Sequence, residues 1–165
     1  MDTVQVKRDW DRDGYLVISN ASTLQEYERL QQQVYKMDLL ELGLFAAFSN
    51  EQFKDGLAKI KSKGLIKDGE KLQRSFGVYG TAAAWERYEA AIQAINKQIR
   101  ERCNPYEVYL YEYNNFECCL DMDGDTRAVE AVLRIWPKET VRSKLAGKRF
   151  RAYQSIDEIS LHLNK

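Results

Sequence analysis

YEVYLYEYNNFECCLDMDGDTRAVEAVLRIW, residues 106–136, is the stretch around which the rest of the chain is predicted to fold. Three tyrosines stand at every second position in its first half, which places them on one face of a strand: Tyr109, Tyr111 and Tyr113. The pair Asn114-Asn115 then suits the positive φ angles of a two-residue hairpin turn. We therefore expect Tyr106–Leu120 to form an aromatic β-hairpin, with a single long strand as the alternative.

An acidic turn and an amphipathic helix follow the predicted hairpin. Asp125 is expected to cap this helix, because Asp side chains accept hydrogen bonds from the first free N–H groups of a helix. Apolar residues then recur on one helical face: Ala128, Val129, Val132, Leu133 and Trp136. Pro137 should end the helix, and a short basic helix closed by Gly147 is expected over Lys138–Ala146.

Capping signals predict where three other helices begin. Ser or Thr followed three residues later by Glu or Gln marks a helix start near Thr23, Ser49 and Ser155. Gly64 is expected to end the second of these helices, because glycine readily adopts the left-handed conformation found there.

Residues before the central stretch supply the remaining elements. Thr81 is predicted to cap the longest helix, Ala82–Cys103, which Asn104-Pro105 should end. Leu72–Gly80 is interpreted as one strand. The apolar run Leu39–Phe48 fits a buried helix and a buried strand equally well, so its secondary structure stays open.

These elements predict a single α+β domain over residues 1–165. A small antiparallel sheet, made of Leu72–Gly80 and the Tyr106–Leu120 hairpin, should pack against Ala82–Cys103 and Thr126–Ile135. We expect an N-terminal hairpin extension over residues 1–20 and a C-terminal helix within residues 152–165.

The composition favours a cytoplasmic globular protein. Of the 165 residues, 44% are apolar and 12% aromatic, which is typical of a chain that buries a core. No 18-residue apolar run is present, so no membrane span is predicted, and the first residues lack the apolar core of a signal peptide. The three cysteines are expected to be reduced thiols.

Two acidic clusters were considered as cation sites. Asp9, Asp11 and Asp13 before Gly14 resemble the start of a calcium loop, but Asn20 stands where a bidentate Glu is needed. Asp121, Asp123 and Asp125, with Glu117 nearby, offer a magnesium site of the kind that phosphoesterases use. Turn formation and helix capping are the favoured interpretation of both clusters, so we predict no metal site and no cofactor.

Nucleophilic and zinc chemistry are disfavoured by the scarcity of histidine. His162 is the only histidine, and no catalytic partner stands near it in the sequence. Cys118 and Cys119 are adjacent on a predicted strand and would point to opposite faces. We therefore predict no catalytic residue.

Charge is unevenly distributed although the formal net charge is zero. Cations predominate in Lys54–Arg74 and again near the C-terminus, at Lys138, Arg142, Lys144, Lys148, Arg149 and Arg151. Acidic residues predominate between Glu107 and Glu130. Basic segments can bind phosphates, so nucleic-acid binding through the two cationic segments is one functional hypothesis.

Three segments resemble an uncharacterised family of small proteins carried by phages and mobile elements of gut bacteria. They are FAAFSNEQFKDG (45–56), EVYLYEYNNFEC (107–118) and DGDTRAVEAV (123–132). The resemblance implies no catalytic activity and no functional residue. Its setting among accessory genes of mobile elements suggests counter-defence, including inhibition of CRISPR nucleases.

The favoured functional prediction is a non-enzymatic inhibitor that binds a host protein, such as a defence nuclease. Tyrosine is a preferred interface residue, and carboxylates on a strand and helix start can imitate a path of phosphates. The predicted contact residues are Tyr109, Tyr111, Glu112, Glu117, Asp121 and Asp123. Nucleic-acid binding and a metal-dependent phosphoesterase are the alternatives.

Overall fold

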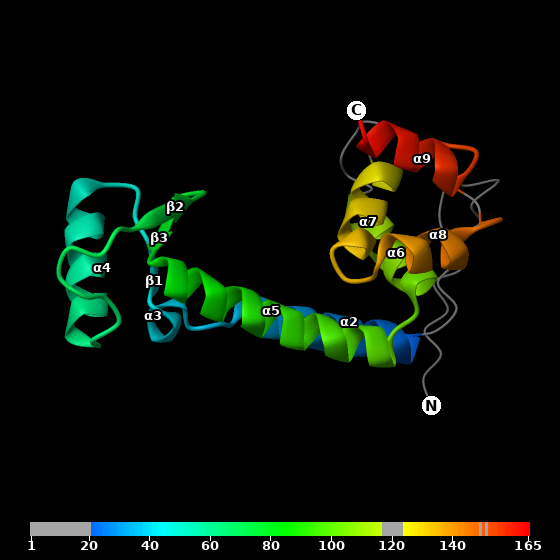
Figure 1. Cartoon of the computed structure of the whole chain (residues 1–165). Coiled ribbons are helices and arrows are strands. Elements are labelled where there is room, and N and C mark those ends of the chain that lie inside the picture. The colour runs from blue at the N-terminus through cyan, green and yellow to red at the C-terminus, as the bar shows by residue number, and fades with distance from the viewer. Residues whose placement is uncertain (1–20, 117–123, 149, 151) are drawn as a thin grey trace. The chain divides into compact units, whose positions relative to one another are not determined.

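The computed structural model describes residues 21–116, 124–148, 150 and 152–165. The predicted N-terminal hairpin of residues 1–20 lies outside these residues. The described chain is α+β, as predicted, with a three-stranded antiparallel sheet among helices (Figure 1). In order the elements are α2 (Ala21–Tyr35), α3 (Leu39–Leu42), β1 (Leu44–Ala46), α4 (Asn50–Ser62), β2 (Gln73–Ser75), β3 (Val78–Gly80), α5 (Ala82–Arg102), α6 (Pro105–Phe116), α7 (Gly124–Leu133), α8 (Lys138–Leu145) and α9 (Ile156–Leu163).

The chain forms two compact units. Gln33–Ile95 is called the sheet unit, and Met1–Gln32 together with Asn96–Lys165 is called the helical unit. The boundaries fall within α2 and α5, so both helices contribute residues to each unit. One domain over all 165 residues remains a prediction.

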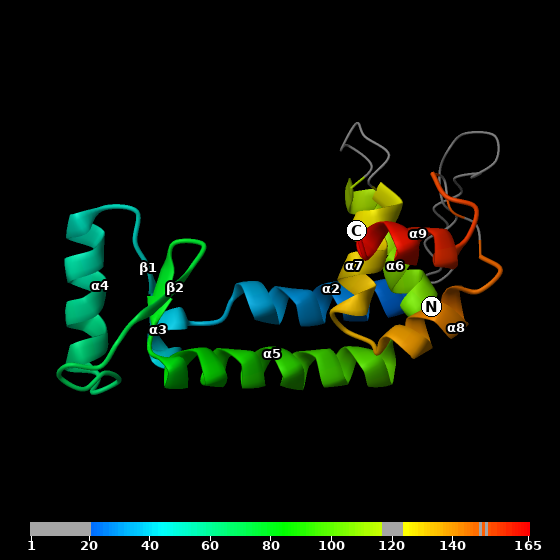
Figure 2. The same ribbon diagram turned by 45° about the horizontal axis from the view of Figure 1, so that its top comes forward.

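The sheet unit is built on three short strands in the order β1-β3-β2. Phe45, Tyr79 and Arg74 are cross-strand neighbours and therefore share one face of the sheet. That face packs against α4, which lies along one side of the sheet in two views (Figures 1 and 2). The Phe45 ring stacks on Tyr79 at 5.6 Å, and Phe53 of α4 meets both rings edge-on.

Several capping predictions in the sheet unit are confirmed. Ser49 Oγ accepts from the Gln52 N–H at 3.2 Å, and Thr81 Oγ1 accepts from the Ala84 N–H at 3.1 Å. Gly64 follows the end of α4 with φ +68°, as a helix-ending glycine should. Leu39–Phe48, which the sequence left open, contains both a short helix and a strand.

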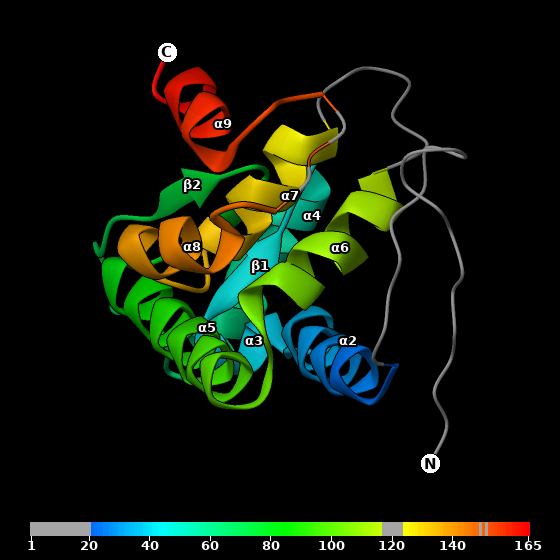
Figure 3. The same ribbon diagram turned by 90° about the vertical axis from the view of Figure 1, so that its right-hand side faces the viewer.

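The helical unit has an apolar core that α7 helps to fill. This helix packs against α6, α8 and α9 (Figure 3). Fully buried side chains come from six of the helices: Tyr27, Leu30, Ile99, Val108, Tyr109, Val129, Val132, Leu145 and Ile159. The predicted cap of α9 is confirmed, because Ser155 Oγ accepts from the Glu158 N–H at 3.3 Å.

The predicted β-hairpin at Tyr106–Leu120 is wrong over its described part. Residues Pro105–Phe116 form α6, including the Asn114-Asn115 pair that was expected to turn. Asn104 Oδ1 accepts from the Tyr106 N–H at 2.9 Å, and Pro105 occupies the first helical position, which its fixed φ favours. Asn104-Pro105 therefore starts a helix as well as following one. Residues 117–120 lie outside the described part.

The predicted single strand at Leu72–Gly80 is also wrong in detail. It is a hairpin of β2 and β3, whose closing pair is Ser75 and Val78. Its partner on the other side is β1 and not the Tyr106–Leu120 segment. The sheet is thus assembled within the sheet unit alone.

Candidate functional site

The predicted contact residues on α6 do not share one surface. Tyr109 is fully buried, and its hydroxyl donates to the Asp125 carboxylate. Tyr111 and Glu112 are half-buried on another side of the helix: the Tyr111 ring meets Tyr27 edge-on at 5.3 Å, and Glu112 accepts from the Tyr27 hydroxyl. Successive helical residues are about 100° apart, so the alternation that a strand would align is dispersed. Glu117, Asp121 and Asp123 lie outside the described residues.

Asp125 is a buried structural residue and not the predicted N-cap. It is the second residue of α7 and only 1% exposed. One carboxylate oxygen accepts from Tyr109, and the other accepts from the Ala152 N–H at 2.6 Å. Burial, then the neighbouring Asp125, raises the pKa of the Tyr109 hydroxyl far above its ordinary range, so this hydroxyl remains a donor. The phosphoesterase hypothesis thereby loses Asp125 as an open metal ligand.

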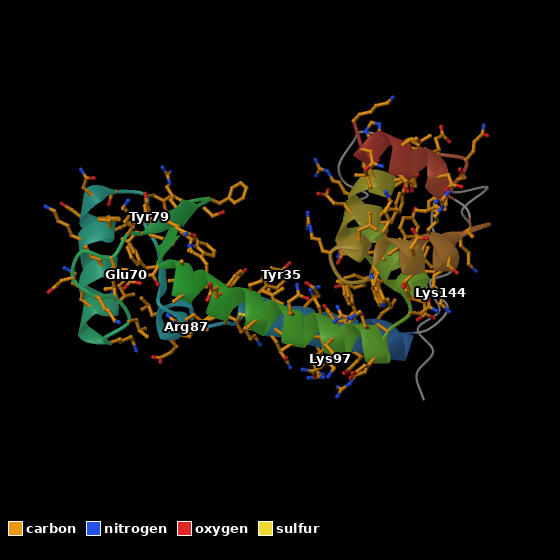
Figure 4. All side chains as sticks on the ribbon, in the orientation of Figure 1. Tyr35, Glu70, Tyr79, Arg87, Lys97 and Lys144 are labelled. Atoms are coloured by element: carbon orange, nitrogen blue, oxygen red, sulfur yellow. The ribbon has the colours of Figure 1, made fainter. Side chains whose placement is uncertain are left out.

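The cations of the basic segment at 138–151 point to different surroundings. Arg142 Nε pairs with Asp157 of α9 at 2.9 Å, and Lys138 lines the same small pocket. Lys144, labelled in Figure 4, lines a separate cleft with Arg100 and Asn104. Lys148 lies 4.8 Å from the centre of the Tyr106 ring. Arg149 and Arg151 lie outside the described residues.

Cys103 is a poor candidate nucleophile. Burial, reinforced by Glu26 and Glu107, raises the pKa of its thiol to about 11, so the thiol stays protonated at neutral pH. The His162 ring lies 5.8 Å from the ring of Tyr153. Among the described residues, no group of three or more His, Cys, Asp or Glu side chains is placed to hold a metal ion.

The sheet unit exposes two phenylalanines at one end of its sheet. Phe76 and Gly77 form the two-residue loop between β2 and β3, and Phe76 is 100% exposed. Phe48, just beyond β1, is 81% exposed. Its ring lies against Gly77, where an added Cβ would be 2.6 Å from Phe48 Cε1. Phe48 and Phe76 are called the aromatic tip.

The backbone of the aromatic tip is strained at Phe76. Phe76 has φ +47° and Gly77 has φ +79°, the positive pair typical of a type I′ hairpin turn. Glycine and asparagine adopt such angles readily, whereas a bulky residue there is a genuine outlier. The strain is of the order of 1–3 kcal/mol. Strain at a fully exposed aromatic residue points to a role outside the fold.

Two hydrogen bonds hold the aromatic tip in place. The Ala47 N–H donates to the Gly77 carbonyl at 2.9 Å, and the Phe48 N–H donates to Gln52 Oε1 at 2.7 Å. Gln52 belongs to the capping box of α4, so the start of that helix fixes Phe48. Arg74, on the neighbouring strand β2, lies over the Tyr79 ring at 5.7 Å. Figure 4 labels Tyr79 in the sheet unit.

Sequence reasoning missed the aromatic tip because Leu72–Gly80 was taken as one strand. The available signal was Gly77 in the middle of the run. Glycine after one other residue, between two short β-prone segments, is the pattern of a two-residue turn. Phe76 replaces the usual Asn or Asp, which concealed that pattern.

No described helix is long and apolar enough to cross a membrane. No curated protein and no solved structure matches the chain. A family model described as a family of unknown function (DUF7659) matches residues 26–147. That match covers most of the chain, including the aromatic tip and helices α4 to α8. The chain therefore belongs to this family of unknown function.

Proposed function

We propose that this protein is a non-enzymatic inhibitor that binds a protein partner through its aromatic tip. The observation that carries the proposal is the strained and fully exposed Phe76 beside the exposed Phe48. Large exposed apolar side chains that cluster on a surface are typical of interaction sites. Aromatic side chains also supply much of the binding energy at protein interfaces.

The aromatic tip is rigid in a way that favours binding. Its loop has two residues, its strands are paired on both sides of β3, and Gln52 holds Phe48. A side chain already ordered in its bound position loses less conformational entropy on association. Strain that is retained in the fold is then compatible with selection for binding.

The finer identity of the partner rests on the resemblance to accessory proteins of phages and mobile elements. It motivates a cytoplasmic host target, such as a defence nuclease or CRISPR effector. The surface proposed for the contact is the aromatic tip, because Tyr109 is buried and Glu112 is engaged by Tyr27.

Affinity capture with matched variants tests this function. Wild-type protein, Phe76→Asn and Tyr35→Asn should each be used as bait in nuclease-treated lysate of the host. Tyr35 is the control because it is 76% exposed and lies in the same unit. We expect the wild type and Tyr35→Asn to retain a stoichiometric protein that Phe76→Asn loses. Equal capture by Phe76→Asn, or no partner at low salt, would contradict the proposal.

A second candidate function is nucleic-acid binding by the segment Lys54–Arg74. Lys59 and Lys63 are engaged by Asp55 and Glu41, but five exposed cations of this segment lie outside the ion pairs: Lys54, Lys61, Lys67, Lys71 and Arg74. Together with Phe76 they could combine phosphate binding with base stacking. This alternative predicts a shifted oligonucleotide whose affinity falls steeply with salt. An unshifted oligonucleotide at low ionic strength would exclude it.

A further inference from the structure

A groove lies beside the aromatic tip in the sheet unit. It has a volume of about 410 Å³ and is bounded by α3, β1 and α4. Leu40, Leu44, Phe45 and Ala46 supply apolar walls, while Asp38 and Asp55 contribute exposed carboxylates. Phe48 lines this groove and also belongs to the aromatic tip. The protruding and the hollow parts of this surface are therefore neighbours.

The open edge of the sheet contributes backbone groups to the groove. β1 is an edge strand, and its pairing with β3 includes the Ala47 N–H bond to Gly77. Backbone groups alternate in direction along an antiparallel strand. Those of Ala46 consequently face away from β3, and Ala46 is exposed. They are available to hydrogen-bond a segment that enters beside β1.

We propose that the aromatic tip of one molecule docks in this groove of a second copy, forming a reciprocal dimer. A two-fold interface needs a self-complementary patch, and a protrusion next to a matching hollow provides one. Charge is complementary as well: Arg74 stands two residues from Phe76, whereas Asp38 and Asp55 line the receiving groove. Each molecule would present both halves of the contact.

The size of the contact indicates a reversible dimer. Each of the four participating phenylalanine rings can bury roughly 150–250 Å². Their combined area approaches the ~1,000 Å² that separates specific interfaces from incidental contacts. Dissociation in the micromolar range is therefore expected. The inference deepens the proposed function, on which its regulatory meaning rests, because the dimer would cover the surface that binds the partner.

Sedimentation equilibrium tests the dimer from micromolar to near-millimolar concentration. We expect wild type and Tyr35→Asn to show a monomer–dimer equilibrium, and Phe76→Asn to remain monomeric. Circular dichroism should show all three variants folded, because Asn suits the backbone angle at position 76. A wild type that stays monomeric throughout, or a Phe76→Asn variant that dimerises normally, would overturn the proposal.

Photocrosslinking tests the docking position. p-Benzoylphenylalanine in place of Phe76 retains an aromatic side chain, and mixing ¹⁴N- and ¹⁵N-labelled protein distinguishes crosslinks between copies. We expect mixed-isotope crosslinks to residues 38–48 or 52–59, which line the groove. Crosslinks to other segments, or within one chain only, would refute the groove as the docking site.

The two proposals can fail separately. A monomeric wild type that still captures a partner through Phe76 would end the dimer and leave the proposed function intact. A dimer disrupted by Phe76→Asn, with partner capture unchanged in that variant, would sustain the dimer and refute the proposed function.

Discussion

The Tyr109 hydroxyl donates a hydrogen bond to the Asp125 carboxylate inside the helical unit, where the two side chains are 0% and 1% exposed. The second Asp125 oxygen accepts from the Ala152 backbone. Asp125 thus joins α6 and α7 to the segment that leads into α9. A buried carboxylate is tolerated in such a place only when its oxygens are hydrogen-bonded.

Tyr109→Phe should destabilise the protein by about 1–3 kcal/mol, because it leaves a buried carboxylate oxygen without one of its donors. The ring contact with Phe150, at 5.3 Å between centroids, needs no hydroxyl and should remain. Urea denaturation followed by circular dichroism measures the loss. Tyr35→Phe is the control, since removing an exposed hydroxyl should change stability by less than about 0.5 kcal/mol.

A double-mutant cycle with Asp125→Asn isolates the Tyr109–Asp125 interaction. We expect the two substitutions to be non-additive by about 1–3 kcal/mol, as for residues that share a buried network. Additive losses would show that the hydrogen bond carries little of the stability.

Predicting α6 from sequence failed because its tyrosines fit two periodicities. Tyr109 and Tyr113 are four residues apart, so they align on a helix as well as on a strand. β-propensity favoured the strand, but tertiary burial outweighs propensity when one helical face packs in a core. Here that face includes Val108, Tyr109 and Tyr113. The decisive local signal was Asn104-Pro105, interpreted only as the end of α5.

Helix boundaries set by local hydrogen bonds were predictable. Ser49, Thr81 and Ser155 each accept the backbone N–H three residues on, and these bonds depend on neighbouring residues alone. The aromatic tip was not predictable in this way. Its exposure depends on β1 pairing with β3 across more than thirty residues, and on Phe48 meeting Gly77.

Phe76→Asn should stabilise the isolated protein by about 0.5–1 kcal/mol. Asparagine tolerates the φ of +47° better than phenylalanine does, and the Phe76 ring is fully exposed, so no packing is lost. Thermal unfolding of dilute protein, where self-association is negligible, measures the gain. A lower melting temperature for Phe76→Asn would show that the ring stabilises the fold and is not strained for an external purpose.

Gly56→Ala should destabilise the sheet unit by about 1–3 kcal/mol, the usual effect of overpacking. Alanine favours helix over glycine by about 1 kcal/mol, but its Cβ would lie 2.2 Å from Phe45 Cδ2. Phe45 is held between Phe53 and Tyr79, so its ring cannot easily move aside. Urea denaturation is the measurement. Ala58→Gly, at an exposed position of the same helix, reports the propensity effect alone; a stabilising Gly56→Ala would refute the close contact.

Glu26 should make stability depend on pH below about 4.5. Hydrogen bonds from Arg29 and then Arg102 lower the pKa of its carboxyl from 4.5 to about 2. A folded pKa below the unfolded one stabilises the native state above pH 4.5, and this contribution is lost as pH falls through 2. The difference in melting temperature between wild type and Glu26→Gln should shrink over that window. High salt should reduce the difference because the pair is at the surface, and Glu28→Gln should show no comparable trend.

Cys103 should react slowly with iodoacetamide in the native protein. Its thiol pKa of about 11, against an ordinary 9.0, reduces the reactive thiolate at pH 8 by about a hundredfold. Tandem mass spectrometry can assign the label to Cys103 and follow its rate. The same protein in urea is the control, because unfolding exposes the thiol and separates it from Glu107 and Glu26. Equal rates in the native and unfolded protein would mean that Cys103 is neither shielded nor held near those carboxylates.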